Sequence, residues 1–249
     1  MLKEERHDFI LNEVRIRNRV LLSDLAQQLN VSEDTVRRDL ADLHNQGKLK
    51  KVHGGAIAKS FTPFSFHQEE IYDHQNKQII ARKAAQLLKK DMVVLITGGT
   101  TNLELVTQLP EDLHLTFFTP SLQVAMQLGQ MQSVDTILLG GKVAKDAQVT
   151  FGMDALKTLS QTQADICFLG TGHLDPVNGV SEFDWEVVQL KKAMIDSSKK
   201  IVLLTLSAKL NSTQRYKICE VNQIHTLITE LDPSDPALAQ FKAVGLEII

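Results

Sequence analysis

Residues 20–43 have the sequence VLLSDLAQQLNVSEDTVRRDLADL, and this stretch decides the fold of the N-terminal quarter of the chain. Leu25 and Ala26 are placed to face the core of a short helix, and the small alanine allows a second helix to cross closely. Asn30 can adopt the left-handed conformation that a tight turn between two helices requires. The stretch therefore predicts a helix-turn-helix.

The second helix of the pair is predicted to begin after Ser32, which is a good N-cap residue and is followed by two acidic side chains. Its buried face is predicted from apolar residues at helical spacing, which are Val36, Leu40 and Leu43.

Four polar residues lie outside this apolar stripe, in the N-terminal half of the second helix. They are Ser32, Thr35, Arg37 and Arg38. This end of the helix enters the major groove in DNA-binding helix-turn-helix proteins, where arginine can pair with guanine O6 and N7. We expect these residues to contact DNA; the alternative is a helical hairpin with solvated arginines.

Residues 47–56, GKLKKVHGGA, follow directly and predict a small β-hairpin, or wing, with its turn at Gly54-Gly55. Its basic side chains are expected to contact the phosphate backbone and so to position the helix. They are Lys48, Lys50, Lys51 and His53. A lysine run that is merely solvated is the alternative, and its place directly after the helix favours the wing.

The net charge of −3 is unevenly distributed along the 249 residues. Residues 1–59 contain 11 Lys and Arg against 9 Asp and Glu, whereas the remainder contains 16 against 21. A small basic face that binds phosphates and a larger part that does not bind them would produce this asymmetry.

The chain shows neither a signal peptide nor an apolar run long enough to span a bilayer. Cys167 and Cys219 lack the spacing of metal ligands and are expected to be reduced and buried. We therefore expect a cytoplasmic protein without a membrane partner, a metal or a cofactor.

From residue 76 onwards, apolar strands alternate with helical patterns, which predicts a doubly wound, mostly parallel α/β domain. The predicted strands are 92–96, 113–119, 136–139, 164–170, 200–206 and 224–229. The predicted helices are 76–89, 121–128, 185–197 and 236–244, with another beginning at Asn102. We therefore assign residues 1–59 to a winged helix-turn-helix domain, 60–75 to a linker and 76–249 to the α/β domain.

Glycine-rich loops follow three of the predicted strands, at the sheet edge where open parallel sheets bind ligands. The residues concerned are Gly98, Gly99, Thr100, Thr101, Gly140, Gly141, Gly170, Gly172 and Asp175. Glycines permit close approach of the backbone, and the helix after Gly99 offers free N–H groups to an anion. Lys209, after a later strand, could supply a cation to a phosphate. A plain strand-to-helix turn and a solvated lysine are the alternatives.

Residues 31–56, VSEDTVRRDLADLHNQGKLKKVHGGA, resemble the DNA-binding signature of the DeoR family of bacterial regulators. The resemblance extends to the loops above, to the helix at 191–195 and to Lys209. It implies a C-terminal domain similar to ribose-5-phosphate isomerase, which holds a phosphorylated sugar with Thr100 and Thr101 at the phosphate. It also makes repression the expected sign. We expect a homo-oligomer, a dimer or a tetramer, on double-stranded operator DNA, because one small reading head makes too few contacts and such motifs normally read paired half-sites.

The chain departs from the family pattern at four places. Leu21 replaces a polar residue at the start of the first motif helix, and Leu206 replaces the Asp three residues before Lys209. Pro120 replaces an Asn, and Gly172-His173 replaces Asp-Gly. The last three surround the presumed sugar, so the resemblance implies altered sugar contacts.

Two other functions remain open from the residues. An aldose–ketose isomerase with an accessory DNA-binding domain would need a carboxylate that moves a proton between carbons. The acids near the relevant loops are Asp175, Glu182, Asp184 and Glu186, and no pair has a spacing that demands catalysis. A pure interaction module would require that the basic head bind no DNA.

Overall fold

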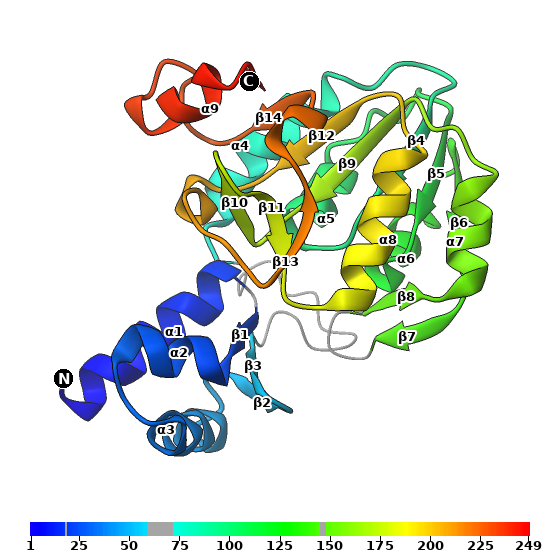
Figure 1. Ribbon diagram of the computed structural model, residues 1–249. Helices are drawn as coiled ribbons and strands as arrows, with labels where there is room; N and C mark the ends of the chain where they lie inside the picture. Colours follow the sequence, from blue (N-terminus) through cyan, green and yellow to red (C-terminus); the bar gives the residue numbers. More distant parts are fainter. Residues whose placement is uncertain (18, 59–71, 145–147) are drawn as a thin grey trace. The chain divides into compact units, whose positions relative to one another are not determined.

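The computed structural model describes residues 1–17, 19–58, 72–144 and 148–249. The chain divides into two compact units, Met1–Tyr72 and Asp73–Ile249, whose elements are labelled in Figure 1. Most of the proposed linker at 60–75 lies outside the described residues. Within the described residues, no helix is long and apolar enough to cross a membrane.

The first unit is a winged helix-turn-helix, as predicted (Figure 1). Its elements are α1 (Lys3–Arg17), β1 (Arg19–Leu21), α2 (Leu22–Leu29), α3 (Glu33–Asn45), β2 (Lys50–Val52) and β3 (Gly55–Ile57). The strands form an antiparallel sheet in the order β1-β3-β2. Asn30 ends α2 in the left-handed conformation, with φ 51° and ψ 49°, which confirms the predicted turn.

The turn of the wing is one residue earlier than predicted. Val52 pairs with Gly55 across the hairpin, so His53 and Gly54 form the turn and Gly55 belongs to β3. A Cβ atom on Gly55 would lie 1.9 Å from the carbonyl oxygen of Val20, because β1 passes directly beside it. The sequence offered no sign of β1, and the presence of this third strand is what requires glycine at position 55.

The same hairpin explains how α2 begins without a polar cap. Leu21 is the N-cap residue and offers no side-chain hydrogen bond. Instead the backbone N–H of Leu22 donates to the carbonyl oxygen of Gly54 at 2.8 Å. One of the unsatisfied N–H groups at the helix start is therefore paired by the wing turn.

Gly55→Ala should destabilise the first unit by about 2 kcal/mol or more, because the added methyl group overlaps backbone that cannot move freely. Gly54→Asn is the matched control, since Gly54 has φ 76° with open space around it and asparagine tolerates positive φ. Urea unfolding of both variants measures the difference. Equal stability of the two variants would contradict the packing described here.

The second unit contains a seven-stranded, wholly parallel sheet in the order β15-β14-β12-β9-β4-β5-β6. The strands are β4 (Val93–Ile96), β5 (Leu115–Thr119), β6 (Val134–Leu138), β9 (Ile166–Gly170), β12 (Ile201–Leu204), β14 (Thr226–Ile228) and β15 (Glu247–Ile248). The predicted strands are all present with small shifts at their ends, and β15 was not predicted. The chain order reverses between β4 and β9, which makes their carboxyl ends the switch point of the sheet.

Helices cover both faces of the sheet, and the helices on each face pack against one another. Figure 1 shows α8 in front of the sheet and α5 behind it. They are α4 (His74–Ala85), α5 (Thr100–Thr107), α6 (Leu122–Leu128), α7 (Met153–Ser160) and α8 (Trp185–Asp196). This arrangement confirms the doubly wound α/β fold. The helix predicted at 76–89 begins two residues earlier and ends at Ala85. The one predicted at 236–244 is a 3-10 turn, Pro236–Leu238, followed by α9 (Ala239–Ala243).

Two small antiparallel sheets were not predicted. β7 (Lys142–Ala144) pairs with β8 (Val149–Phe151), and β10 (His173–Asp175), β11 (Gly179–Glu182) and β13 (Tyr216–Cys219) form a three-stranded sheet. Their strands are only three or four residues long, too short for a periodic pattern to be distinguished from a loop.

Candidate functional site

The N-terminal end of α3 has the geometry that the sequence predicts. The Ser32 side chain accepts a hydrogen bond from the N–H of Thr35 at 3.2 Å, which confirms the N-cap. The predicted inner face is fully buried, with Val36, Leu40 and Leu43 all at 0% exposure. Arg37 and Arg38 are left on the exposed side of the helix.

Both arginines are held by Asp34, one turn before them. The Arg37 guanidinium forms an ion pair with the Asp34 carboxylate, and the Arg38 Nε donates to the Asp34 carbonyl oxygen at 3.2 Å. The Arg37 and Asp34 side chains are 54% and 73% exposed. An ion pair this exposed contributes little to stability, so the guanidinium can exchange its carboxylate partner for a base or a phosphate.

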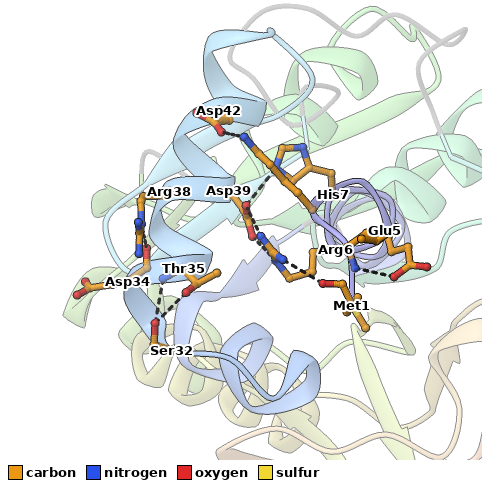
Figure 2. Close-up of polar contacts among 12 residues, drawn as sticks. Met1, Glu5, Arg6, His7, Ser32, Asp34, Thr35, Arg38, Asp39 and Asp42 are labelled. Atoms are coloured by element: carbon orange, nitrogen blue, oxygen red, sulfur yellow. Dashed lines mark hydrogen bonds and ion pairs between the residues drawn. The ribbon is translucent and has the colours of Figure 1, made fainter.

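A buried acid on α3 ties this helix to α1 (Figure 2). Asp39 is 2% exposed and accepts two hydrogen bonds from Arg6, at 2.7 Å from Nε and 3.1 Å from Nη2. The His7 Nε2 lies 3.2 Å from the same carboxylate. Sequence reasoning missed this cluster, although a charged residue inside the apolar stripe of α3 was the available signal.

Asp39→Ala should lower the melting temperature and weaken DNA binding, because it leaves the largely buried guanidinium of Arg6 without its carboxylate and frees α3 from α1. Asp42→Ala is the matched control one turn later, where the pair with Lys3 is exposed. Thermal unfolding and a DNA-binding titration check both effects. An Asp39 variant that behaves like the Asp42 variant would show that the cluster does not position α3.

The predicted wing residues lie on or beside the hairpin β2–β3. Lys48 and His53 are exposed, and Lys50 and Lys51 are partly exposed on β2. These basic residues are therefore accessible to a phosphate backbone, as the wing interpretation requires.

In the second unit, hydrogen bonds at Thr97 join the carboxyl ends of the two central strands. The Gly170 N–H donates to the Thr97 Oγ1 at 2.8 Å, and the Asn102 Nδ2 donates to both Thr97 oxygens at 2.8 Å. A Cβ atom on Gly170 would lie 3.2 Å from the Gly98 carbonyl oxygen. The structure therefore brings the predicted Gly98 and Gly170 loops together.

The N-terminus of α5 lies in this loop cluster. Gly99 has φ 113° and open space where a Cβ atom would be. Thr100 is 3% exposed, and its Oγ1 has no hydrogen-bond partner among the described residues. A buried hydroxyl without a partner at a helix N-terminus is a site where an anion gains both a hydrogen bond and the helix dipole.

Two buried lysines lie close to each other at this edge. Lys209 is 6% exposed and donates to the Thr171 carbonyl oxygen at 3.2 Å. Lys77 of α4 is 2% exposed; burial and the nearby Lys209 ammonium lower its pKa to about 7, against the raising effect of Asp73 and Glu104. Sequence reasoning did not select Lys77, because a lysine in a helical pattern over a hundred residues before Lys209 gives no sign of this proximity.

The other predicted effector residues are placed differently. The Asp175 carboxylate accepts hydrogen bonds from the backbone N–H groups of Val177 and Asn178, and these bonds hold its pKa below the usual range. A Cβ atom on Gly141 would lie 2.3 Å from the Phe151 carbonyl oxygen, so glycine at this position allows β7 and β8 to pair closely at their ends. Gly140 and Gly172 have open space around them.

The positions that depart from the family pattern are internal. Leu206 is 0% exposed and His173 is 7% exposed on β10. The Pro120 carbonyl oxygen accepts hydrogen bonds from the N–H and the hydroxyl of Thr150. These side chains are parts of the packed structure around the loop cluster.

Comparison with known protein families shows to which family this chain belongs. Residues 72–231 match the DeoR C terminal sensor domain, and residues 6–62 match the DeoR-like helix-turn-helix domain. The chain belongs to the DeoR family. It is accordingly a DNA-binding transcriptional regulator, with α3 as the expected recognition helix of this family member.

Three named relatives align with this chain over nearly their whole length. The HTH-type transcriptional regulator GolR of Listeria innocua is 28% identical, over 100% of this chain and 98% of that protein. The HTH-type transcriptional repressor GlcR of Bacillus subtilis is 28% identical, over 100% and 96%. The glycerol-3-phosphate regulon repressor of Escherichia coli is 27% identical, over 94% and 93%.

Among solved structures, ribose 5-phosphate isomerase A of Methanocaldococcus jannaschii is similar over 54% of this chain and 53% of its own, with 18% identity and a TM-score of 0.41. A likeness at this level carries no conclusion about activity.

The stability of this DeoR-family chain should rise with pH where Lys77 titrates. Because the folded pKa is about 7 and the ordinary value is 10.5, the unfolded chain binds more protons between these values. The free energy of unfolding should therefore increase over this range, by at most about 1.4 kcal/mol per pH unit from this group. Lys77→Met should remove that increase, whereas Lys90→Met, at an exposed lysine, should retain it. Identical pH profiles for the two variants would contradict the lowered pKa of Lys77 in the folded protein.

Proposed function

We propose that this regulator is a repressor of carbohydrate-metabolism genes whose operator binding is modulated by a phosphorylated sugar or a related metabolite. The observation that supports the proposal is a set of groups suited to binding an anion at the switch point of the sheet. There the N-terminus of α5, the unpartnered Thr100 hydroxyl and the two buried lysines occupy one edge. Relatives named as repressors of glycerol-3-phosphate and other regulons support the same class of function.

The phosphate is assigned to the N-terminus of α5. Backbone N–H groups after Gly99 and the Thr100 and Thr101 hydroxyls would donate to its oxygens. Lys209 and Lys77 would supply positive charge from the other side. Burial and the nearby Lys209 disfavour the charged form of Lys77 in the empty site, and a bound dianion would favour that charged form, so a dianion gains more there than a neutral ligand would.

The remaining sugar is assigned to the neighbouring loops. Gly98, Gly140, Gly170 and Gly172 allow the backbone to approach a ligand closely, and Gly141 and Asp175 shape the adjacent turns. Leu206 and Pro120 remove the polar side chains that the family pattern places around the sugar. We infer a ligand with fewer polar contacts there than the common pattern provides.

On the DNA, Arg37 and Arg38 with Thr35 and Ser32 would contact the major groove, while Lys48, Lys50, Lys51 and His53 hold the phosphates. We infer a homo-oligomer, because one small reading head makes few contacts and such motifs usually bind paired half-sites. The effector can change operator affinity only through its different affinity for two states of the protein. Such a regulator would act in the cytoplasm, where its operator is.

An isomerase activity is the weaker candidate. Three of the four acids considered have structural partners: Asp175 orders its own turn, Asp184 caps α8 and Glu182 lies 3.1 Å from the Lys191 ammonium. A carboxylate held in this way is poorly placed to move a proton between two carbons. Turnover in a coupled assay on pentose and hexose phosphates would overturn the regulatory proposal as the whole function.

Arg37→Ala should weaken binding to the cognate operator by about 1–3 kcal/mol, if the guanidinium contacts a base. Lys51→Ala should instead weaken binding to all sequences and reduce the salt dependence, since it removes a phosphate contact. Titrations of operator and unrelated DNA at several salt concentrations separate the two effects. An unchanged preference for the operator would remove Arg37 from base recognition.

Thr100→Val should abolish or strongly weaken the response to sugar phosphates while leaving operator binding and thermal stability unchanged. The hydroxyl has no partner among the described residues, so its loss costs the empty protein nothing. Thr162→Val, a hydroxyl at the end of α7 that donates to the Thr158 carbonyl, is the control. The measurement is release of the protein from its upstream DNA by a panel of sugar phosphates. Normal release of the Thr100 variant would place the phosphate elsewhere.

A further inference from the structure

A second buried polar group without a partner lies on the other side of the Gly98 loop. Gln148 directly precedes β8 and is 6% exposed. Its Nε2 has no hydrogen-bond partner within the described ranges of the chain. Buried amide N–H groups in proteins are nearly always paired, and an unpaired one marks a place for a water molecule or a ligand.

The backbone fixes Gln148 in an unusual conformation. Its φ is 52°, in the left-handed region that non-glycine residues rarely adopt. The Gln148 N–H donates to the Ala144 carbonyl oxygen at 2.7 Å, and its own carbonyl accepts from the Leu122 N–H at 3.0 Å. The first turn of α6 therefore holds this residue in place. Local strain that surrounding contacts maintain is a frequent property of ligand sites.

Gln148 is next to the wall of the anion site. A Cβ atom on Gly98 would lie 3.4 Å from the Cγ1 of Val149 and 3.2 Å from the Oγ of Ser121. Ser121 and Val149 also form an isolated β-bridge, which joins the end of β5 to the start of β8. The residue before Val149 thus lies at the edge where β4 and β5 end.

The two sides of the Gly98 loop have different chemistry. In the order of the sheet, Gly170 and Lys209 follow β9 and β12 on one side of β4, and Ser121 follows β5 on the other. Neighbouring strands are about 4.8 Å apart, so β9 and β5, on either side of β4, are about 10 Å apart, roughly the length of a small sugar phosphate. The cations lie on the first side, and Gln148, whose neighbour Val149 bridges to Ser121, lies on the second.

We propose that Gln148 determines effector specificity, by donating a hydrogen bond from its side-chain amide to a hydroxyl or carbonyl oxygen in the part of the ligand remote from the phosphate. This assignment rests on the proposed function. The assignment adds a prediction that the proposed function does not make. The α5 N-terminus and the lysines bind the phosphate of any ligand, and Gln148 selects among the sugars attached to that phosphate.

The test compares inorganic phosphate with a panel of sugar phosphates on the full-length protein. Gln148→Met keeps the side-chain length and removes the amide, and Gln130→Met, at an exposed position after α6, is the matched control. The dissociation constant of the best sugar phosphate should rise about tenfold in the Gln148 variant. Stabilisation by inorganic phosphate should stay within about twofold of the wild type, and thermal stability without ligand should not fall.

Gln148→Asn is the second variant, because asparagine tolerates positive φ and withdraws the amide by one methylene group. It too should lose affinity for the sugar phosphate and retain the response to inorganic phosphate. Equal affinities in wild type and both variants would overturn the role of Gln148 and assign its amide to a bound water. A wild-type protein that responds to no sugar phosphate would overturn the proposed function itself, and with it this assignment.

Discussion

The hydrogen bonds around Thr97 are the constraint on which the second unit depends. In an open parallel sheet, the ligand-binding crevice lies where the direction of strand addition reverses, here between β4 and β9. The Thr97 hydroxyl accepts the Gly170 N–H, and the Asn102 amide binds Thr97 from the first turns of α5. One side chain at the end of β4 thereby sets the separation of two loops and the direction of the helix N-terminus between them.

Two buried lysines accompany these hydrogen bonds at the carboxyl edge of the sheet. Burial normally excludes lysine, and two buried lysines close together are costly unless an anion or a function accounts for them. Lys77 comes from α4 and Lys209 from the segment after β12, and the lowered pKa of Lys77 reflects their proximity. In the proposed function, these two lysines favour the binding of a phosphate group at this edge of the sheet.

The first unit buries an acidic side chain, whereas the second unit buries the two lysines. Asp39 is buried on α3 and held by Arg6, so the helix that is expected to enter DNA is anchored through a carboxylate rather than only through apolar contacts. On its outer face, Arg37 is held by a weak, exposed ion pair with Asp34 and Arg38 by a hydrogen bond to the Asp34 carbonyl oxygen, so both remain exchangeable. A firm inner face and a loosely held outer face suit a helix that must keep its orientation while its side chains change partners.

The sequence by itself determined the helix-turn-helix, the wing and the doubly wound sheet, because each depends on local patterns: apolar spacing, an N-cap at Ser32, a left-handed Asn30 and continuous apolar strands. It also selected Thr100 and Lys209. Only the tertiary structure decided that Asp39 meets Arg6, that Lys77 lies near Lys209, that β1 forces glycine at position 55, and that the buried Gln148 Nε2 has no hydrogen-bond partner among the described residues. These features join residues far apart in the chain or depend on burial, and no local spacing records them. The physical reason is that a pattern within one helix or strand fixes its own buried face, whereas the partner of a buried charge is fixed by how the elements pack.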